Sequence, residues 1–302
     1  MGLACGVPAG QADGVARMRG IADRVEQVLG QAVVATTPVA GGDICTATRV
    51  RLSDGRSALV KTRPGAVEGF FESEARGLRW LAEPGAAHVA EVLAVEQDCL
   101  VLRWVEPSRP NAENSTALGR ELARLHASGA AGFGAEQDGF IATLPLPNGS
   151  APTWPEFYAT KRVLPYLKLA ADRDHIEATD VETVEAVVRR LTELAGPEEP
   201  PARLHGDLWS GNIVWGAEHG TLIDPAAHGG HRETDLAMLS LFGVPHLQRL
   251  LDAYQDETPL ADGWEERQPV HQLFPLLVHA ALFGGHYGLK ASEAAQRALQ
   301  AG

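Results

Sequence analysis

The stretch from Leu204 to Asp224 constrains the fold of this chain more than any other. It reads LHGDLWSGNIVWGAEHGTLID, with Asp207 in a polar loop and Asn212 five residues later. A short β-like run, a turn and a second β-like run then lead to Asp224. We therefore expect a loop and a tight hairpin that deliver an acid, an amide and a second acid to one place.

This order of polar residues is typical of a kinase site. In such a site one Asp meets the proton of the substrate hydroxyl, while an Asn and a second Asp hold Mg²⁺ on ATP. The spacing D-x-x-x-x-N, followed by an Asp at a strand end, predicts that arrangement in 207–224. Asp and Asn also form caps and β-turns, so the rest of the chain has to supply the other parts of a nucleotide site.

The sequence upstream predicts a small antiparallel sheet. After a helix expected over 13–29, β-branched residues lead to Gly41 and Gly42, and the turn 53–56 separates two further strands, the second with Lys61 near its end. Glycines let backbone N–H groups approach phosphates, and a Lys on the third strand can reach the α- and β-phosphates. A glycine loop or a strand lysine is common on its own, so the order of these features carries the inference.

A helix predicted over 67–83 supplies a carboxylate for that lysine. Glu74 is the predicted partner of the lysine and Glu72 is the competitor, because an ATP-site lysine needs an acid on the following helix to fix its position. Two more strands follow, and the proline-containing segment 106–110 reads as a hinge. Backbone groups near Trp104 and Glu106 are then expected to face the adenine ring.

The remainder of the chain reads as mostly helical. Its periodic apolar segments predict helices over 116–128, 154–170, 181–194, 236–242, 245–254 and 270–287, with a Gly/Pro-rich loop over 129–153. Together these segments predict an α+β fold with two lobes. We expect a flexible tail over 1–12, a nucleotide-binding lobe with a small sheet and one key helix over 13–106, and a larger helical lobe over 107–302 that carries the catalytic loop, the metal site and the substrate pocket.

Composition excludes several classes of partner. A net charge of −13 argues against nucleic acid, whose phosphates need a basic footprint. No secretory signal and no run of 18 apolar residues is found, so a cytoplasmic location without membrane attachment is expected. Cys5, Cys45 and Cys99 are too widely spaced to suggest a zinc site or a disulfide framework. Whether the chain is a monomer or a homodimer stays open.

The segment LHGDLWSGN resembles the signature of the fructosamine kinase (ketosamine-3-kinase) family, usually L-H-G-D-L-W-x-G-N. Segments 40–44, 71–81 and 231–238 resemble further blocks of that family, so the resemblance covers nearly the whole chain. It implies a protein-kinase-like fold and ATP-dependent phosphorylation of a sugar hydroxyl on a ketosamine, either free or protein-bound. It also implies a part in protein deglycation.

The resemblance implies roles for individual residues. Asp207 would be the catalytic base, Asn212 and Asp224 the Mg²⁺ ligands, and Lys61, held by Glu74, the contact to the phosphates. Trp209 would form a wall for the sugar, although a core Trp is an equal alternative. Further substrate-side candidates are Asp138, Trp154, Arg162, His279 and Tyr287.

The sequence departs from the family pattern near its end. Relatives usually carry Asn at the positions of Val278 and Ala281, so the identity of the ketosamine (fructosyl or ribulosyl) stays open. Cys45 lies in the glycine-rich loop, where a thiol could act as a redox switch or simply as a small buried hydrophobe.

Three alternatives compete with this interpretation. Another small-molecule kinase, for aminoglycosides, choline or homoserine, would share the H-G-D-x-x-x-x-N pattern. A catalytically silent kinase-like scaffold could bind the nucleotide alone. Metal hydrolase chemistry from His205 and Asp207 lacks a helical H-x-x-x-H spacing and is the least supported.

Overall fold

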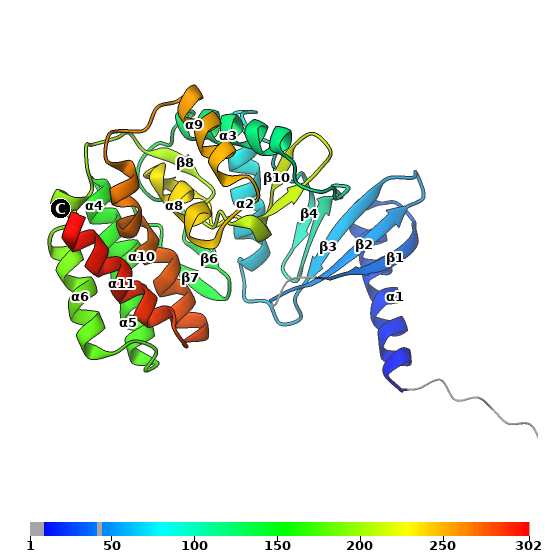
Figure 1. Cartoon of the computed structure of the whole chain (residues 1–302). Helices are drawn as coiled ribbons and strands as arrows, with labels where there is room; N and C mark the ends of the chain where they lie inside the picture. The colour runs from blue at the N-terminus through cyan, green and yellow to red at the C-terminus, as the bar shows by residue number, and fades with distance from the viewer. Residues whose placement is uncertain (1–8, 41–43, 302) are drawn as a thin grey trace, which may run out of the picture. The chain divides into compact units, whose positions relative to one another are not determined.

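The computed structural model describes residues 9–40 and 44–301, with side chains from residue 19 onward (Figure 1). The chain divides into two compact units. The first unit contains the residues up to Ala75 together with Ala90–Trp104, and the second contains Arg76–Val89 together with Val105–Gly302. Within the described ranges, no helix is both long enough and apolar enough to span a bilayer.

The first unit is built on an antiparallel sheet with strand order β1-β2-β3-β5-β4. The bounds are β1 Val33–Val39, β2 Thr46–Leu52, β3 Ser57–Thr62, β4 Val92–Glu96 and β5 Cys99–Arg103. Alternation along β2 buries Val50 and Leu52 while Arg51 points to solvent. The buried face packs on Ile21 and Val25 of helix α1 (Ala9–Leu29), which closes a small core.

Arg24 ties α1 to the sheet. Its guanidinium lies 2.5 Å from carboxylate oxygens of both Glu96 and Asp98, at the β4–β5 turn. Helix α1 begins at Ala9, so the last four residues of the predicted 1–12 tail are helical. Residues 1–8 lie outside the described part of the chain.

Helix α2 (Phe70–Ala82) crosses the division between the units at Ala75. The predicted first lobe, 13–106, included residues 76–89, but the structure groups these with the second unit. The reason is apolar packing: Trp80, Leu81, Ala86, Ala87 and Val89 join a core cluster that contains residues of helices α3 (Ala112–Ala127), α8 (Glu233–Phe242) and α9 (Leu247–Glu257).

The second unit is mainly helical. Its other helices are α4 Trp154–Phe157, the π-helix η1 Tyr158–Val163, α5 Leu164–Asp172, α6 Ala178–Arg189, α7 Leu191–Leu194, the 3₁₀-helix η2 Ser210–Asn212, α10 Trp264–Phe283 and α11 Tyr287–Ala301. Three two-stranded pairs accompany them, namely β6 Gly139–Ile141 with β7 Leu144–Leu146, β8 Ala202–Leu204 with β11 His228–Gly230, and β9 Ile213–Trp215 with β10 Gly220–Leu222. The predicted loop 129–153 thus contains a short hairpin.

Two helix boundaries differ from prediction for local reasons. Helix α3 starts at Ala112, upstream of the predicted start at 116, because Asn111 and Asn114 form a reciprocal capping box at 2.8 Å each. The helix predicted over 270–287 ends at Phe283, where Gly284 and Gly285 take positive φ values of 63° and 62° before α11 begins.

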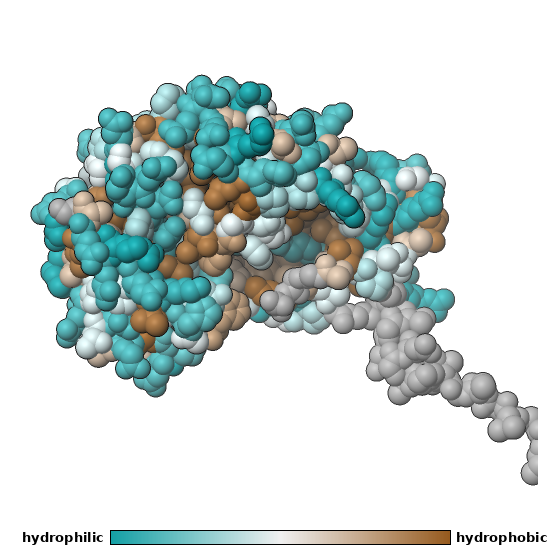
Figure 2. All heavy atoms as spheres, viewed as in Figure 1, coloured by the Kyte–Doolittle hydropathy of each residue, from teal (hydrophilic) through white to brown (hydrophobic). Residues whose placement is uncertain are grey.

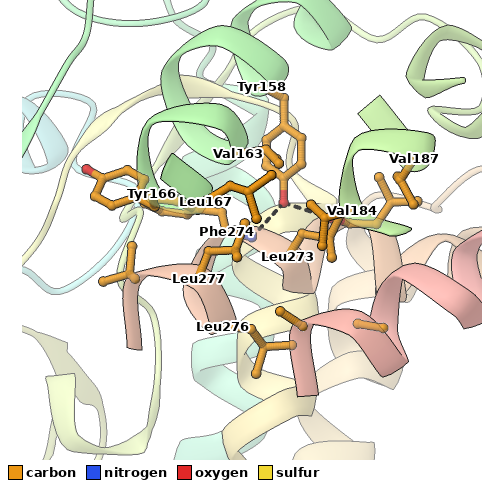
Figure 3. Close-up of a cluster of buried hydrophobic side chains, with 14 of the residues drawn as sticks. Tyr158, Val163, Tyr166, Leu167, Val184, Val187, Leu273, Phe274, Leu276 and Leu277 are labelled. Atoms are coloured by element: carbon orange, nitrogen blue, oxygen red, sulfur yellow. Dashed lines mark hydrogen bonds between the residues drawn. The ribbon is translucent and has the colours of Figure 1, made fainter. Parts of the chain in front are cut away.

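A buried proline interrupts helix α10 in the second unit. Pro275 has no N–H to offer the carbonyl of His271 one turn earlier, and the buried Tyr158 hydroxyl lies 2.9 Å from that oxygen. The same hydroxyl accepts a hydrogen bond of 3.1 Å from Phe274 N (Figure 3). Tyr158 therefore satisfies backbone groups that the proline disrupts. On the face shown in Figure 2, hydrophilic residues dominate and hydrophobic ones gather in limited areas.

Candidate active site

The β9–β10 hairpin and the loop after β8 position the polar residues of the opening stretch. Asp207 lies in the loop, Asn212 ends helix η2 directly before β9, and Asp224 follows β10. Gly206 has a φ of 79°, and a Cβ there would lie 2.2 Å from the carbonyl oxygen of Ala226, so only glycine fits. Asp224 itself has a φ of 54°, in the left-handed region.

The structure brings Asp207, Asn212 and Asp224 together within the second unit. The Asn212 side-chain nitrogen donates hydrogen bonds of 2.8 Å to Asp207 Oδ2 and of 2.8 Å to the Asp207 carbonyl, and it lies 3.5 Å from the Asp224 carbonyl. Since the nitrogen makes these contacts, the amide oxygen of Asn212 is the atom that remains for a metal. A carboxylate oxygen and an amide oxygen are hard ligands of the kind that Mg²⁺ prefers, so Asp224 and Asn212 fit that ion.

Burial raises the pKa of Asp207 to about 7. The negative charges of Asp224 and Asp235 act in the same direction, while the hydrogen bond from Asn212 opposes them. A cation bound beside this group would favour its ionised form and lower the pKa again.

Asp235, at the start of α8, holds the loop that carries Asp207 through hydrogen bonds from the loop backbone. Its two oxygens accept hydrogen bonds from His205 N at 2.8 Å and from Gly206 N at 2.9 Å, and His126 Nε2 lies 3.3 Å away. Burial alone would raise the pKa of Asp235, but the hydrogen bonds and the charge of His126 keep it below its usual value. Sequence reasoning missed Asp235, which directly precedes the predicted helix 236–242. A buried acid needs buried donors, and its donors here come from a loop about thirty residues earlier, which no local pattern marks.

His205 fixes the loop to the end of the hairpin. Its Nε2 lies 2.8 Å from the Ile223 carbonyl, and its Nδ1 accepts a hydrogen bond of 3.2 Å from Asp207 N. Burial lowers the pKa of His205, which favours the neutral ring with its proton on Nε2. The residue is thus a structural link between Asp207 and the residue before Asp224.

In the first unit, Lys61 on β3 forms an ion pair with Glu74 on α2. The lysine Nζ lies 2.7 Å and 2.8 Å from the two carboxylate oxygens of Glu74, and both side chains are nearly buried. Within the described residues, Glu72 Oε2 makes no hydrogen bond, so Glu74 and not Glu72 is the partner seen here. Gly41 and Gly42 lie outside the described residues.

The two residues expected near an adenine ring differ in exposure. Trp104 follows β5 and is half-buried, and the guanidinium of Arg49 lies 4.5 Å from its ring centroid. Glu106 is exposed. The Trp104 backbone N–H donates to the Ser57 carbonyl at 3.2 Å, which fixes the start of this segment to the strand β3.

Three of the substrate-side candidates lie in one group of rings. Ring centroids are 6.4 Å apart for Trp209 and Phe242, 4.7 Å for Phe242 and His279, 5.8 Å for His279 and Phe283, and 5.0 Å for His279 and Tyr287. Trp209 is 41% exposed and Phe283 is 60% exposed. We call these five residues the aromatic surface cluster; its first member lies two residues after Asp207.

The other three candidates contact protein groups of the second unit; Arg162 and Trp154 are buried, and Asp138 is exposed. Arg162 is buried and donates hydrogen bonds of 2.6 Å to Asn148 Oδ1 and to the Pro147 carbonyl, and burial lowers its pKa to about 10. Asp138 Oδ1 accepts a hydrogen bond of 2.7 Å from Asn148 N. Trp154 is buried in ring contacts with Tyr158 and His271.

Val278 and Ala281, where the sequence departs from the family pattern, are also buried. They belong to the large apolar core of the second unit, so their apolar character matches their surroundings. Cys45, in the segment that follows the undescribed residues 41–43, is half-buried, and Cys99 on β5 is buried.

The arrangement of these elements has counterparts among solved structures. An aminoglycoside phosphotransferase in a ternary complex with ADP and hygromycin B superposes with a TM-score of 0.62 at 16% identity, covering 94% of this chain and 99% of that one. The fold is that of the protein-kinase-like phosphotransferases, and the predicted fold class is confirmed.

Sequence comparison narrows the class to one family. The profile of the fructosamine kinase family matches residues 17–301, so the chain belongs to that family. A probable ketoamine kinase of Klebsiella aerogenes is 37% identical over 266 residues, which cover 86% of this chain and 91% of the relative. A solved structure from Thermobifida fusca, provisionally named fructosamine-3-kinase, is 46% identical with a TM-score of 0.90, covering 93% of this chain and 98% of that one. The predicted family is therefore confirmed, and the chain is a phosphotransferase of that family.

Proposed function

We propose that this enzyme transfers the γ-phosphoryl group of ATP to a sugar hydroxyl of a ketosamine. The grouping of Asp207, Asn212 and Asp224 in a chain that matches the fructosamine kinase profile from residue 17 to residue 301 carries this proposal. Its relatives named as ketoamine and fructosamine kinases support the substrate class. We also propose a role in protein deglycation, because phosphorylation makes such adducts unstable, and a cytoplasmic location for the enzyme.

In this proposal Asp207 orients the attacking hydroxyl and accepts its proton. Phosphoryl transfer depends mainly on positioning and charge stabilisation, so an ionised and correctly placed carboxylate is sufficient. The hydrogen bond from Asn212 to Asp207 Oδ2, at 2.8 Å, holds one oxygen in place and leaves Oδ1 for the hydroxyl.

Mg²⁺ would be held by the Asn212 amide oxygen and the Asp224 carboxylate, with phosphate oxygens and water completing its shell. When bound, the ion neutralises the charge of the phosphates. The left-handed backbone at Asp224, with φ at 54°, is the kind of strained conformation that persists at functional sites.

Nucleotide phosphates would contact Lys61. Its ion pair with Glu74, with both Nζ–carboxylate distances below 3 Å, restricts the lysine to one orientation. We further assign phosphate contacts to the backbone of Gly41 and Gly42, and adenine contacts to the backbone near Trp104 and Glu106.

The ketosamine would bind at the aromatic surface cluster. Trp209, in the catalytic loop and 41% exposed, offers an apolar face to the sugar or its amine. His279 Nδ1 lies 2.7 Å from the Pro275 carbonyl, and burial lowers the pKa of the ring, so a neutral His279 presents Nε2 as an acceptor beside Tyr287. Asp138, Trp154 and Arg162, which are engaged with protein groups, would support the shape of this unit instead of contacting the substrate.

A substrate screen with a matched pair of variants tests the proposal. With ATP and Mg²⁺, the wild-type enzyme should phosphorylate ribulosyl- or fructosyl-lysine, and Asp207→Asn should lower kcat roughly 10²–10⁴-fold while nucleotide binding is retained. Asp172→Asn, at an exposed ion pair with Lys168, serves as the control and should be fully active.

Each contrary outcome has its own meaning. Turnover of an aminoglycoside or choline, with none on either ketosamine, would show a kinase of another specificity. Nucleotide binding without turnover of any acceptor would show a kinase-like scaffold. Full activity of Asp207→Asn would mean that Asp207 is not the base.

A further inference from the structure

Arg162, on the π-helix η1, is a buried cation whose hydrogen-bond acceptors are neutral. It is 1% exposed. Its Nη1 donates hydrogen bonds to the carbonyls of Pro147 at 2.6 Å and Lys161 at 3.1 Å, and its Nη2 donates to Asn148 Oδ1 at 2.6 Å. Its Nε donates a longer hydrogen bond of 3.4 Å to His228 Nε2. Within the described residues none of these acceptors carries a charge. A buried cation without a carboxylate costs free energy, so its presence here indicates a role other than stability.

The contact with Arg162 fixes the tautomer of the buried His228 ring. A guanidinium can only donate hydrogen bonds, so His228 Nε2 is the acceptor and the ring proton lies on Nδ1. That Nδ1 lies 2.8 Å from the Ala226 carbonyl, to which it donates. Burial and the positive charge of Arg162 both lower the pKa of His228, to about 3, so the ring is neutral at neutral pH. Arg162 therefore sets the direction of both hydrogen bonds of this ring.

The Ala226 carbonyl lies where the two acidic segments of the candidate site meet. It comes two residues after Asp224, and a Cβ on Gly206 would lie 2.2 Å from its oxygen and 3.0 Å from Cε1 of His228. Gly206 directly precedes Asp207. Strand β11, which begins with His228, also pairs with β8, which leads into this loop. The His228 ring therefore holds the segment that follows Asp224 against the loop that carries Asp207.

We propose that Arg162 is a positioning residue for phosphoryl transfer. Acting through the neutral His228 ring and the Ala226 carbonyl, it fixes the segment that carries Asp224 relative to the loop that carries Asp207. A single π-helical turn inside a longer helix is frequent at functional sites, and η1 supplies Arg162 between α4 and α5. The inference rests on the proposed roles of the two acids, and it requires no contact between Arg162 and the substrate.

A double-mutant cycle tests whether Arg162 acts through His228. Arg162→Met removes the guanidinium, and His228→Phe keeps an aromatic ring but removes both nitrogens. Each variant should lower kcat about ten- to a hundredfold, because small displacements of reacting groups have effects of that size. The KM for the ketosamine should change little, since four of the five members of the aromatic surface cluster belong to α8, α10 and α11. The double variant should lose no more than either single variant, because the two residues act in one chain of contacts.

Tyr166→Phe is the matched control. Tyr166 is buried, and its hydroxyl donates a hydrogen bond of 2.8 Å to the Pro145 carbonyl, two residues from the Pro147 carbonyl that Arg162 contacts. The variant thus loses a buried hydrogen bond in the same region but leaves His228 untouched, and it should retain kcat. In every variant kcat is expressed per folded molecule, counted by stoichiometric nucleotide binding, so that partial unfolding does not imitate lost positioning.

The tautomer of His228 provides a measurement that does not need activity. In wild-type protein labelled with ¹⁵N-histidine, the NMR signals of this ring should show the proton on Nδ1, and they are identified by their absence from His228→Phe. In Arg162→Met the ring should no longer hold this single tautomer, whereas in Tyr166→Phe it should be unchanged.

Two results would overturn the inference. One is a double variant in which the losses of kcat are additive, and the other is a wild-type His228 ring protonated on Nε2. If Arg162→Met does not fold, Arg162→Lys, which keeps the charge but lacks the Nε–H group, takes its place in the cycle under the same criterion. A wild-type enzyme that phosphorylates other acceptors but no ketosamine would contradict the proposed function instead, and the cycle is then measured with the acceptor that it uses.

Discussion

At the scale of single residues, Asp235 fixes the backbone of the loop that carries Asp207. Its carboxylate accepts hydrogen bonds from the consecutive backbone N–H groups of His205 and Gly206 and lies beside His126. Because these groups are all buried, their donors have no access to water. The position of Asp207 therefore depends on a carboxylate that need not touch the substrate.

Asp235→Asn should destabilise the protein and lower its activity. The amide keeps one acceptor but brings an N–H₂ group towards backbone donors, and breaking a buried charged interaction costs about 3–5 kcal/mol. We expect a loss of that order in the free energy of unfolding, measured in urea, together with a fall in kcat. Asp252→Asn, whose carboxylate bonds only the exposed Gln248 side chain among the contacts described, is the control. Unchanged stability of Asp235→Asn would contradict this view of the loop.

Some residue-level features were predictable because they depend on local order. Lys61 near the end of a strand and Glu74 on the next helix follow from the alternation of apolar residues and from turn chemistry, and the structure shows them paired. The stacking of the His88 ring on the His219 ring was not predictable, because these residues lie more than a hundred positions apart and neither belongs to a motif. Asp235 directly precedes a predicted helix, but nothing local in the sequence indicates that its carboxylate accepts hydrogen bonds from the backbone of a distant loop.

At the scale of elements, helix η2 sets the position of the indole of Trp209. A Cβ at Gly211 would lie 2.3 Å from the Trp209 ring, so the ring rests directly on the glycine backbone. The other side of the cluster is provided by Phe242, at the end of α8. The glycine of the signature segment thus allows the aromatic side chain to fold back over the loop.

Gly211→Ala should displace the Trp209 ring. Since the indole is 41% exposed, it can move outward at little cost to stability, but it should then contribute less to substrate binding. We expect the KM for the ketosamine to rise about tenfold, equivalent to about 1.4 kcal/mol, with a small change in kcat. Gly132→Ala, where a Cβ would meet open space, is the control. An unchanged KM would remove Trp209 from the proposed binding surface.

Element boundaries were predictable where turn residues mark them. The turn at 53–56 lies between β2 and β3, and the second hairpin lies between Asn212 and Asp224 as expected. The pairing of β8 with β11, by contrast, joins strands separated by an excursion of more than twenty residues. The π-helix Tyr158–Val163 was also beyond prediction, because the apolar periodicity of 154–170 predicts a continuous helix and does not mark where its hydrogen bonds widen.

At the scale of the whole molecule, buried histidines should dominate the response of stability to acid. Burial lowers the pKa of His228 and of His231 to about 3, against about 6.5 in an unfolded chain. Between these values the unfolded chain binds more protons, so their contribution is present above pH 6.5 and is lost as the pH falls. Asp207, with its pKa raised to about 7, has the opposite effect between about pH 4 and 7.

His231→Asn should therefore make the free energy of unfolding fall less steeply as the pH is lowered. Each buried neutral histidine makes the free energy of unfolding fall by up to about 1.4 kcal/mol per pH unit, and the variant lacks one of them. Urea unfolding between about pH 5 and 6.5 measures how the free energy of unfolding of each protein changes with pH. This range lies above the pKa values of carboxylates in the unfolded chain, so their titration does not mask the effect. His246→Asn, an exposed position, should run parallel to the wild type. Parallel curves for His231→Asn as well would refute the assignment.

The left-handed backbone at Asp224 has an evolutionary consequence. With φ at 54°, the position favours Asp, Asn and Gly and penalises residues with branched or bulky side chains. A lineage that lost the carboxylate could therefore drift to Asn or Gly while its fold remained intact, but a change to Val or Ile would cost stability as well as metal binding. We expect inactive relatives of such enzymes to carry Asn or Gly at this position. The residue found there would then identify a relative that has lost its catalytic activity.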